Sequence, residues 1–527
     1  MSSSHTESAA LLADAGTVLQ PGFTGLTAPD WVRRHLGEGN LGGVVLYGRN
    51  ISGPEQVAQL TADLYTVRSE VLIATDEEGG EVTRVGAAGG SVSPGNRALG
   101  EVDDVGLTER VARSIGLDLA ASGVNLDYAP DADVNSNPDN PVIGVRSFGA
   151  DGERVARHTA AYVRGLQSAG VAACAKHFPG HGATFEDSHL GLPRLELDDE
   201  QLGQHLLPFR AAVEAGVKSV MTAHILFPAY DEQRPATMSR TILTGLLREE
   251  LGFAGLIVTD GIEMGAISGT YGVAAGAVEA IAAGADTICV GGGLRDEEAY
   301  LYLRDALVWA VREGRLSAER LDEAAERNRA LGRWAAAARR FPVAGDPDRG
   351  LGLDVARRAL RIDGELHAIS GVPHVVELFP TPNIAAGDPP WGVARPLAEL
   401  IPGTTVSRSG EPATRMEGAG LFHAPVADEG AEVDIAPLLG AAVGRPLVVV
   451  VRDPHRHPWM RRAAMALTQA RPDAVVVDVG VGHGVREIFG SRGVTSLATH
   501  GGSRLSGIAA AEALAGREAS VVREGGS

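Results

Sequence analysis

Two kinds of hydrophobic pattern alternate along the first 340 residues of the chain. Short runs of strand length, rich in β-branched residues, are followed by longer stretches in which apolar residues recur with a helical period. This alternation is typical of βα units around a parallel sheet. The expected strands are Thr17–Pro21 (the weakest), Val44–Gly48, Val71–Thr75, Asn125–Pro130, Val171–Ala175, Lys218–Thr222, Leu256–Thr259 and Asp286–Val290. Seven or eight such strands predict a (β/α)8 barrel of the TIM type.

The stretches between these strands carry helix signals at both ends. Several begin with Pro or Asp and several end at Gly, so the capping residues agree with the hydrophobic period. The expected helices include Pro54–Arg68, Leu107–Ala121, Asp151–Ala169, Asp199–Ala215, Val273–Ala283 and Ser317–Arg340.

A stretch rich in Pro, Gly and Asp follows residue 340 and indicates a linker. Beyond it, strand-like runs and helical periods return at His374–Phe379, Pro446–Val451, Trp459–Ala470, Ala474–Val479 and Leu505–Ala515. A chain of 527 residues also exceeds the usual size of one hydrophobic core. We therefore predict an α/β protein with a catalytic barrel at 1–345, a linker at 346–365 and a smaller α/β layered (sandwich) domain at 366–527.

Composition and charge narrow the possible partners. A net charge of −20 without any Lys/Arg run argues against nucleic acid and anionic membranes. No run of 18 apolar residues and no signal peptide is visible, which predicts a cytoplasmic protein. Cys174 and Cys289 lie in apolar runs and are expected to be buried thiols rather than a disulfide. The oligomeric state stays open, with a homodimer as one option.

Ionisable residues follow five of the expected strands. In a βα barrel the carboxyl ends of the strands meet on one face and carry the active site. A single Asp at such a place is more often a helix cap, but five together favour a functional site. These groups are Asp76, Asp131, Lys176 with His177, His224, and Asp260. The loop from Lys176 to His189 is also longer than most βα connections, which favours a function for it.

Histidines in this loop raise the alternative of a zinc-dependent barrel hydrolase. Its ligands would come from His177, His181, His189, His224 and Asp260. Against zinc, no His-x-His pair ends an early strand, and Lys176 would place a cation beside the ion. We therefore predict neither a metal nor another cofactor.

An ordered set of motifs resembles glycoside hydrolase family 3, in particular its β-N-acetylglucosaminidase branch in the two-domain form. The resemblance covers most of residues 15–335, and the tail at 499–516 resembles the end of the second domain of such members. One departure is Gly261, because many relatives have a second Asp after the nucleophile. The matching motifs are Thr75–Arg84, Asn125–Pro130, Arg146–Phe148, Lys176–Gly182, Asp187–His189 and Val258–Asp260.

The resemblance implies a role for each matching residue. Asp260 would be the nucleophile, and His189 the acid/base with Asp187 as its orienting carboxylate. The sugar in the −1 position would be held by Asp76, Arg84, Arg146, Lys176 and His177. A structural alternative stays open for Arg84 and Arg146 as salt-bridge partners of acidic loops. His224 is expected to be a strand-end histidine with a structural role.

These assignments predict a retaining exo-β-N-acetylglucosaminidase that acts on glycosides or oligosaccharides containing N-acetylglucosamine. A histidine is neutral after giving up its proton, so phosphate could replace water, which makes a phosphorylase the second hypothesis. A sugar-binding protein without catalysis is a third, but binding alone needs neither Asp260 nor the Asp187/His189 pair. The aglycone stays open between muropeptides, chitin oligosaccharides and other glycosides.

Overall fold

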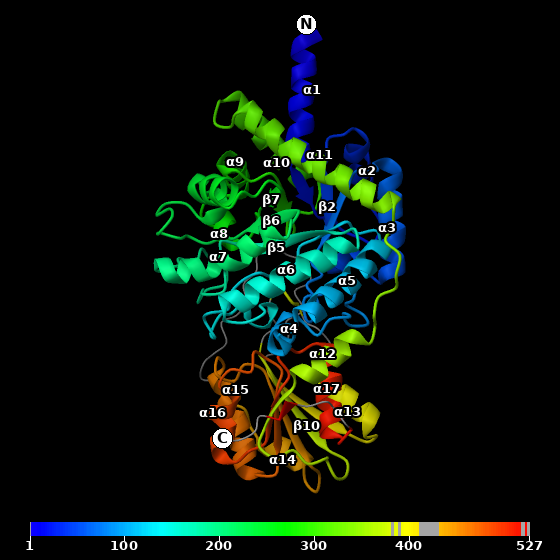
Figure 1. The fold of residues 1–527 in the computed structure, drawn as a ribbon, viewed down its shortest axis with the longest axis vertical. Coiled ribbons are helices and arrows are strands. Elements are labelled where there is room, and N and C mark those ends of the chain that lie inside the picture. Colours follow the sequence, from blue (N-terminus) through cyan, green and yellow to red (C-terminus); the bar gives the residue numbers. More distant parts are fainter. Residues whose placement is uncertain (1, 381–383, 388–391, 411–431, 518–521, 524–527) are drawn as a thin grey trace.

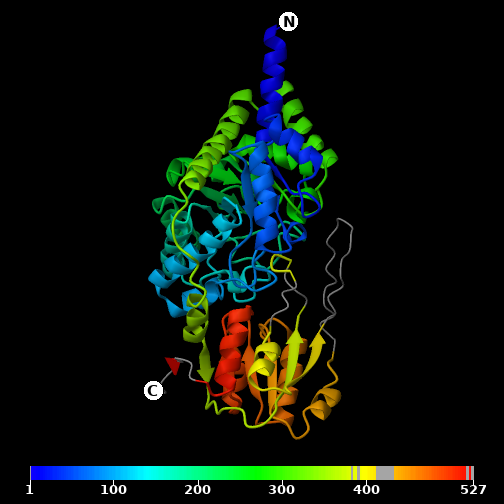
Figure 2. The same cartoon turned by 90° about the vertical axis from the view of Figure 1, so that its right-hand side faces the viewer.

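The computed structural model describes residues 2–380, 384–387, 392–410, 432–517 and 522–523. Two α/β units follow one another along its long axis, a barrel and then a smaller sheet covered by helices (Figures 1 and 2). Helix α1 (Ser2–Thr17) projects from the end of the barrel that faces away from the second unit.

The first unit is built on eight parallel strands. Six of them form one sheet in the order β2-β3-β4-β5-β6-β7, and β1 pairs with β8. A bridge between Val258 and Thr287 joins the end of β7 to the segment before β8, which brings the two sheets together. The strands are β1 (Leu19–Pro21), β2 (Gly43–Leu46), β3 (Leu72–Thr75), β4 (Leu126–Asp127), β5 (Ala172–Phe178), β6 (Ser219–Thr222), β7 (Leu256–Val258) and β8 (Ile288–Val290). Each predicted strand is confirmed, and so is the TIM-type architecture.

Helices surround this sheet, and several start where the sequence placed a cap. The side chains of Asp104, Asp151, Asp198 and Ser317 each accept a hydrogen bond from a backbone N–H of the first turn, as capping residues do. The helical segments are α2 (Asp30–Gly37), η1 (Gly48–Asn50), α3 (Pro54–Val67), α4 (Asn96–Val102), α5 (Val105–Ala121), η2 (Gly144–Arg146), α6 (Gly152–Ser168), α7 (Asp199–Glu214), η3 (Ala236–Met238), η4 (Thr241–Glu250), α8 (Gly265–Ser268), α9 (Val273–Ala283), α10 (Glu297–Arg312) and α11 (Ala318–Arg340).

The second unit contains a sheet in the order β11-β10-β12-β13-β14-β9-β15. All described neighbours are parallel except β14 and β9. Its strands are β9 (Arg361–Asp363), β10 (His374–Phe379), β11 (Thr405–Gly410), β12 (Leu447–Val451), β13 (Val475–Asp478), β14 (Ser496–Ala498) and β15 (Val522–Arg523). Its helical segments are α13 (Ala394–Leu400), α14 (Ala436–Ala441), α15 (Pro458–Ala470), α16 (Val485–Phe489), η5 (Gly490–Arg492) and α17 (Arg504–Leu514). The predicted second α/β layer is thereby confirmed.

The stretch expected to be a linker, 346–365, contains ordered elements. Helix α12 (Leu351–Ala359) packs against α4 and α5 of the barrel and against α17 of the second unit. Strand β9 follows and belongs to the second sheet. The domain boundaries at 345 and 366 stay a proposal.

Among the described residues, no helix combines the length and the apolar composition needed to span a bilayer.

The carboxyl ends of β12 and β14 approach the loops that follow the barrel strands. Arg452, directly after β12, donates two hydrogen bonds of 2.6 Å to the carboxylate of Glu81 in the loop after β3. The backbone N–H of Gly502 donates to the same carboxylate at 2.6 Å. His455 contacts the carbonyl oxygen of Pro138 at 3.0 Å. The second unit therefore covers part of the barrel face at which the carboxyl ends of the strands meet.

We expect Arg452→Ala to lower the free energy of unfolding by about 3 kcal/mol, because the buried Glu81 carboxylate loses its bidentate cation. Urea denaturation followed by circular dichroism measures the shift in midpoint. The matched control is Arg395→Ala, whose exposed side chain pairs with Glu399 on the same helix. Equal midpoints for the two variants would contradict a structural role for the Arg452–Glu81 pair.

Candidate active site

A buried network of charges lies where β3 and β5 end. The carboxylate of Glu78 accepts hydrogen bonds from Arg146 at 2.7 and 3.0 Å. Its Oε1 also lies 2.7 Å from Lys176 Nζ, and Lys176 donates to Asp76 at 2.9 Å. Burial by itself raises the pKa of Glu78, but Arg146 and Lys176 outweigh burial and hold this pKa far below its usual range. Glu78 is therefore an anion that fixes both cations at the barrel mouth.

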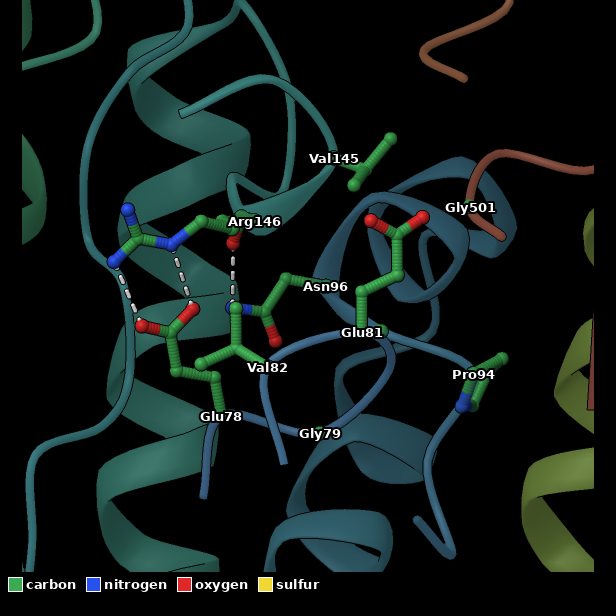
Figure 3. Close-up of a pocket in the computed structure, with 10 residues that line it drawn as sticks. Glu78, Gly79, Glu81, Val82, Pro94, Asn96, Val145, Arg146 and Gly501 are labelled. Carbon is green, nitrogen blue, oxygen red and sulfur yellow. Dashed lines mark hydrogen bonds and ion pairs between the residues drawn. The ribbon is translucent and has the colours of Figure 1, made fainter. Parts of the chain in front are cut away.

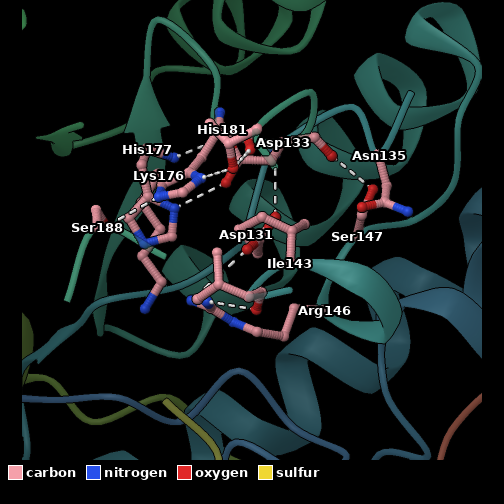
Figure 4. Close-up of polar contacts among 12 residues, drawn as sticks. Asp131, Asp133, Asn135, Ile143, Arg146, Ser147, Lys176, His177, His181 and Ser188 are labelled. Atoms are coloured by element: carbon pink, nitrogen blue, oxygen red, sulfur yellow. Dashed lines mark hydrogen bonds and ion pairs between the residues drawn. The ribbon is translucent and has the colours of Figure 1, made fainter. Parts of the chain in front are cut away.

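His177 belongs to a second buried cluster beside this network (Figure 4). Its Nδ1 donates to Asp133 Oδ2 at 2.7 Å, so its Nε2 is left for another partner. The backbone N–H of His181 donates to the other oxygen of Asp133 at 2.6 Å. The ring of His181 bonds Thr184 and Ser188, and burial lowers its pKa to about 4. His181 is thus a neutral residue that holds the long loop together.

Asp187 and His189 lie at the end of this loop and contact each other directly. Nδ1 of His189 donates to Asp187 Oδ1 at 2.6 Å, and the backbone N–H of His189 donates to the same oxygen at 2.9 Å. Burial by itself lowers the pKa of His189, but the bond to Asp187 and its charge outweigh burial and raise this pKa. The ring is therefore held as a proton donor with Nε2 free of the carboxylate.

Asp260 follows β7, and the backbone N–H of Gly261 donates to its Oδ1 at 2.7 Å. Burial raises its pKa, but the electrostatic interactions with His177, His224 and His189 outweigh burial and hold this pKa well below its usual range. His224 Nε2 donates to the carbonyl oxygen of Gly261 at 3.0 Å and so fixes the turn after Asp260. Asp260 is accordingly an ionised carboxylate near the histidines.

The loop that carries Asp187 and His189 is tied to the segment that follows Asp260. The backbone N–H of Gly265 donates to the carbonyl oxygen of His189 at 3.1 Å, and that of Ala266 to Ser188 at 3.2 Å. A Cβ at Gly265 would lie 2.8 Å from the carbonyl oxygens of both His189 and Leu190. Only glycine therefore allows this close approach, which places Ser188 and His189 beside the start of α8.

The side chain of Arg84 contacts the second unit. One Nη of its guanidinium donates to the carbonyl oxygen of Ala385, in the second unit, at 2.7 Å. The loop before Arg84 helps to line a small cavity of about 10 Å³ (Figure 3). Glu78, Glu81, Arg146 and, from the second unit, Gly501 also line this cavity. A contact between Arg84 and the sugar stays a prediction.

One group of described residues has the spacing of metal ligands, namely Asp131, Asp133 and His177. It shares only His177 with the zinc set considered from the sequence. Both oxygens of Asp133 already accept hydrogen bonds from His177 and His181. Arg146 also lies 3.6 Å from Asp131, so a metal ion would meet a cation there. The group fits a hydrogen-bonded cluster better than a metal centre.

Sequence reasoning missed three carboxylates of this site. Glu78 lies within a quoted motif, but nothing in its spacing showed that it would pair with two cations. Asp133 lies three residues beyond the end of the expected strand Asn125–Pro130. Glu263 accepts hydrogen bonds from the N–H groups of Gly291 and Gly292 through Oε1, whereas its buried Oε2 has no partner among the described residues. The available signal was the departure at Gly261, which is followed two residues later by Glu263.

Comparison with known proteins shows to which family this chain belongs. Residues 19–331 match the family model described as glycosyl hydrolase family 3 N terminal domain. The beta-hexosaminidase A of Pseudoalteromonas piscicida is 38% identical over 283 residues, which are 49% of this chain and 47% of that protein. The beta-hexosaminidase of Methylococcus capsulatus is 38% identical over 255 residues, covering 47% of this chain and 75% of that protein. This chain thus spans less than half of the first relative and three quarters of the second.

A solved structure matches nearly the whole chain. The family 3 β-N-acetylglucosaminidase from Paenibacillus sp. str. FPU-7 has a TM-score of 0.81 and 35% sequence identity, covering 96% of this chain and 97% of that one. The fold and the site together define a class of protein, in which a barrel with carboxylates at its mouth is followed by a second α/β unit. The chain belongs to glycosyl hydrolase family 3 and is a glycoside hydrolase, which confirms the resemblance seen in the sequence.

We expect Gly265→Ala to reduce kcat on p-nitrophenyl glycosides about 10-fold or more, because the added methyl displaces His189 by several tenths of an ångström. The control is Gly245→Ala, where a Cβ meets no atom within 4 Å. Circular dichroism verifies that both variants are folded. Equal kcat values for the two variants would show that the position of the loop with Asp187 and His189 does not limit turnover.

Proposed function

We propose that this chain is a retaining exo-β-N-acetylglucosaminidase. The observation that carries the proposal is the position of the hydrogen-bonded Asp187/His189 pair, on a loop tied to the segment after the ionised Asp260. A retaining glycosidase needs a nucleophile on one side of the anomeric carbon and a proton donor at the leaving oxygen. The names of the relatives, β-hexosaminidase and β-N-acetylglucosaminidase, support N-acetylglucosamine as the sugar.

In the first step, Asp260 attacks the anomeric carbon while His189 gives its Nε2 proton to the departing oxygen. The bond from the anomeric carbon to the aglycone breaks, and an ester between the sugar and Asp260 forms. Asp187 stabilises the imidazolium before transfer and keeps Nδ1 protonated afterwards. In the second step the neutral His189 takes a proton from water, which attacks the anomeric carbon and releases Asp260.

The −1 sugar would be held by groups whose charges are already arranged. Lys176 and Arg146 are fixed by Glu78, and His177 is oriented by Asp133, so each presents its remaining donors in one direction. Asp76 supplies acceptor oxygens beside Lys176. Such preorganised polar groups bind a polyol without losing much side-chain freedom.

Residence in the cytoplasm and a homodimeric state stay predictions from the sequence.

Phosphate is the competing acceptor because the acid/base is a histidine. After proton transfer His189 is neutral, whereas a carboxylate in this role would repel an anion. The sugar ester could then react with phosphate to give a sugar 1-phosphate. The same residues would serve either acceptor.

The proposal predicts that p-nitrophenyl N-acetyl-β-glucosaminide is hydrolysed to free N-acetylglucosamine at a rate independent of phosphate. Mass spectrometry identifies the sugar product with and without phosphate. Asp260→Ala should abolish turnover, because no ester can form. Sugar 1-phosphate with a rate that rises with phosphate would identify a phosphorylase, and unchanged activity in Asp260→Ala would refute the nucleophile.

The raised pKa of His189 predicts the alkaline side of the pH–rate profile. The protonated ring is the acid, so kcat/KM on an unactivated glycoside falls as pH rises through the pKa of His189. Asp187→Asn removes the charge that raises this pKa, and the alkaline limb should move to lower pH by about one unit or more. Asp305→Asn, an exposed carboxylate on α10, is the control. An unshifted limb in Asp187→Asn would contradict the pairing.

A further inference from the structure

A groove of about 620 Å³ runs along the outer side of the acid/base loop. Its walls are the segment 134–138 after β4, residues 183–186 of the loop, the segment 193–197 and the first turns of α7. The volume lies in the ordinary range of ligand sites, roughly 300–1,000 Å³. The groove reaches Glu186, which directly precedes Asp187 in the chain.

The loop that forms one wall of the groove is held in place by hydrogen bonds. The side chain of Asn137 donates to the carbonyl oxygen of Thr184 at 2.9 Å. Asn140 donates to the carbonyl oxygen of His181 at 2.9 Å and to the hydroxyl of Thr184 at 3.2 Å. On the opposite wall, the buried His205 bonds the hydroxyl of Ser136 at 3.2 Å. The groove is therefore built before any ligand arrives.

An aromatic ring in the groove wall is left in solvent. Phe185 is 77% exposed although it lies on the loop that carries the acid/base. The face of an aromatic ring carries partial negative charge and attracts positively polarised C–H groups. A pyranose ring presents such C–H groups on a flat apolar face. Phe185 therefore offers a stacking platform for a sugar outside the −1 position.

The polar groups of the groove suit a neutral ligand. More than half of the lining residues are polar, and they include the exposed amide of Gln204. Carboxylates outnumber cations, because Glu186 and Glu196 face a single Arg194, whose guanidinium bonds Glu196 at 3.0 Å. Together with the net charge of −20, this excess disfavours ligands that carry carboxylates or phosphates. An amide can both donate to and accept from an acetamido group.

We propose that this groove binds the distal part of a neutral oligosaccharide aglycone, with Phe185 stacking on one of its sugar rings. The inference rests on the proposed function, because it assumes that His189 protonates the bond between the −1 sugar and this aglycone. It assigns the substrate as a neutral N-acetylglucosamine oligomer rather than an anionic muropeptide.

The test compares kcat/KM for β-1,4-linked N-acetylglucosamine oligomers of two to five sugars in the wild type. We expect kcat/KM to rise about 5-fold or more with length, since each added contact is realised when the aglycone is bound. Phe185→Ala should flatten this rise, and Phe185→Tyr should keep it. The control Trp309→Ala removes an aromatic that is 57% exposed on α10 and should leave the rise unchanged.

The outcomes separate the two proposals. Suppose that p-nitrophenyl N-acetyl-β-glucosaminide is turned over but kcat/KM for the oligomers does not depend on their length. That result would overturn the proposed binding of the aglycone in the groove and leave the proposed function standing. If a disaccharide with a carboxylate-bearing aglycone reacts faster than the neutral oligomers, the proposed preference for a neutral aglycone is wrong. No turnover of the p-nitrophenyl substrate would refute the proposed function itself.

Discussion

The barrel mouth depends on one buried carboxylate that is shared by two cations. Glu78 is almost inaccessible to solvent, and it pairs with both Arg146 and Lys176. A buried charge without a partner costs several kcal/mol of stability. A change of rotamer at either cation or at the carboxylate would therefore be unfavourable. Lys176 in turn reaches Asp76, and Arg146 lies near Asp131. This mutual constraint sets the directions of the donors and acceptors that a sugar would meet.

The second unit adds a further constraint on the same face. Its parallel strands end toward the barrel loops, so the carboxyl ends of two sheets meet. Arg452 and Gly502 both bond Glu81, only three residues from Glu78 along the chain. The loop after β3 is therefore fixed on one side by the barrel cations and on the other by the second unit. This arrangement gives the second unit a structural reason to be present in a glycoside hydrolase whose candidate catalytic residues all come from the barrel.

Histidines around Asp260 divide their tasks according to their hydrogen bonds. His177 and His189 each donate Nδ1 to a carboxylate, which leaves Nε2 directed elsewhere. His181 and His224 use both ring nitrogens within the protein. The first pair is suited to contact a substrate, and the second pair holds the loop and the strand end. Residue type alone could not separate these roles, because all four follow strands or lie in the same loop.

The sequence by itself determined the barrel, most of its helices and the positions of the candidate catalytic residues. Local patterns were sufficient there, since strand length, caps and motifs depend on neighbouring residues. The tertiary structure alone decided that α12 and β9 occupy the expected linker, that the exposed β11 joins the sheet, and which charges pair. It also revealed the groove at Phe185, whose walls come from five separate stretches of the chain. Such features arise from packing between residues far apart in the chain, which no local pattern records.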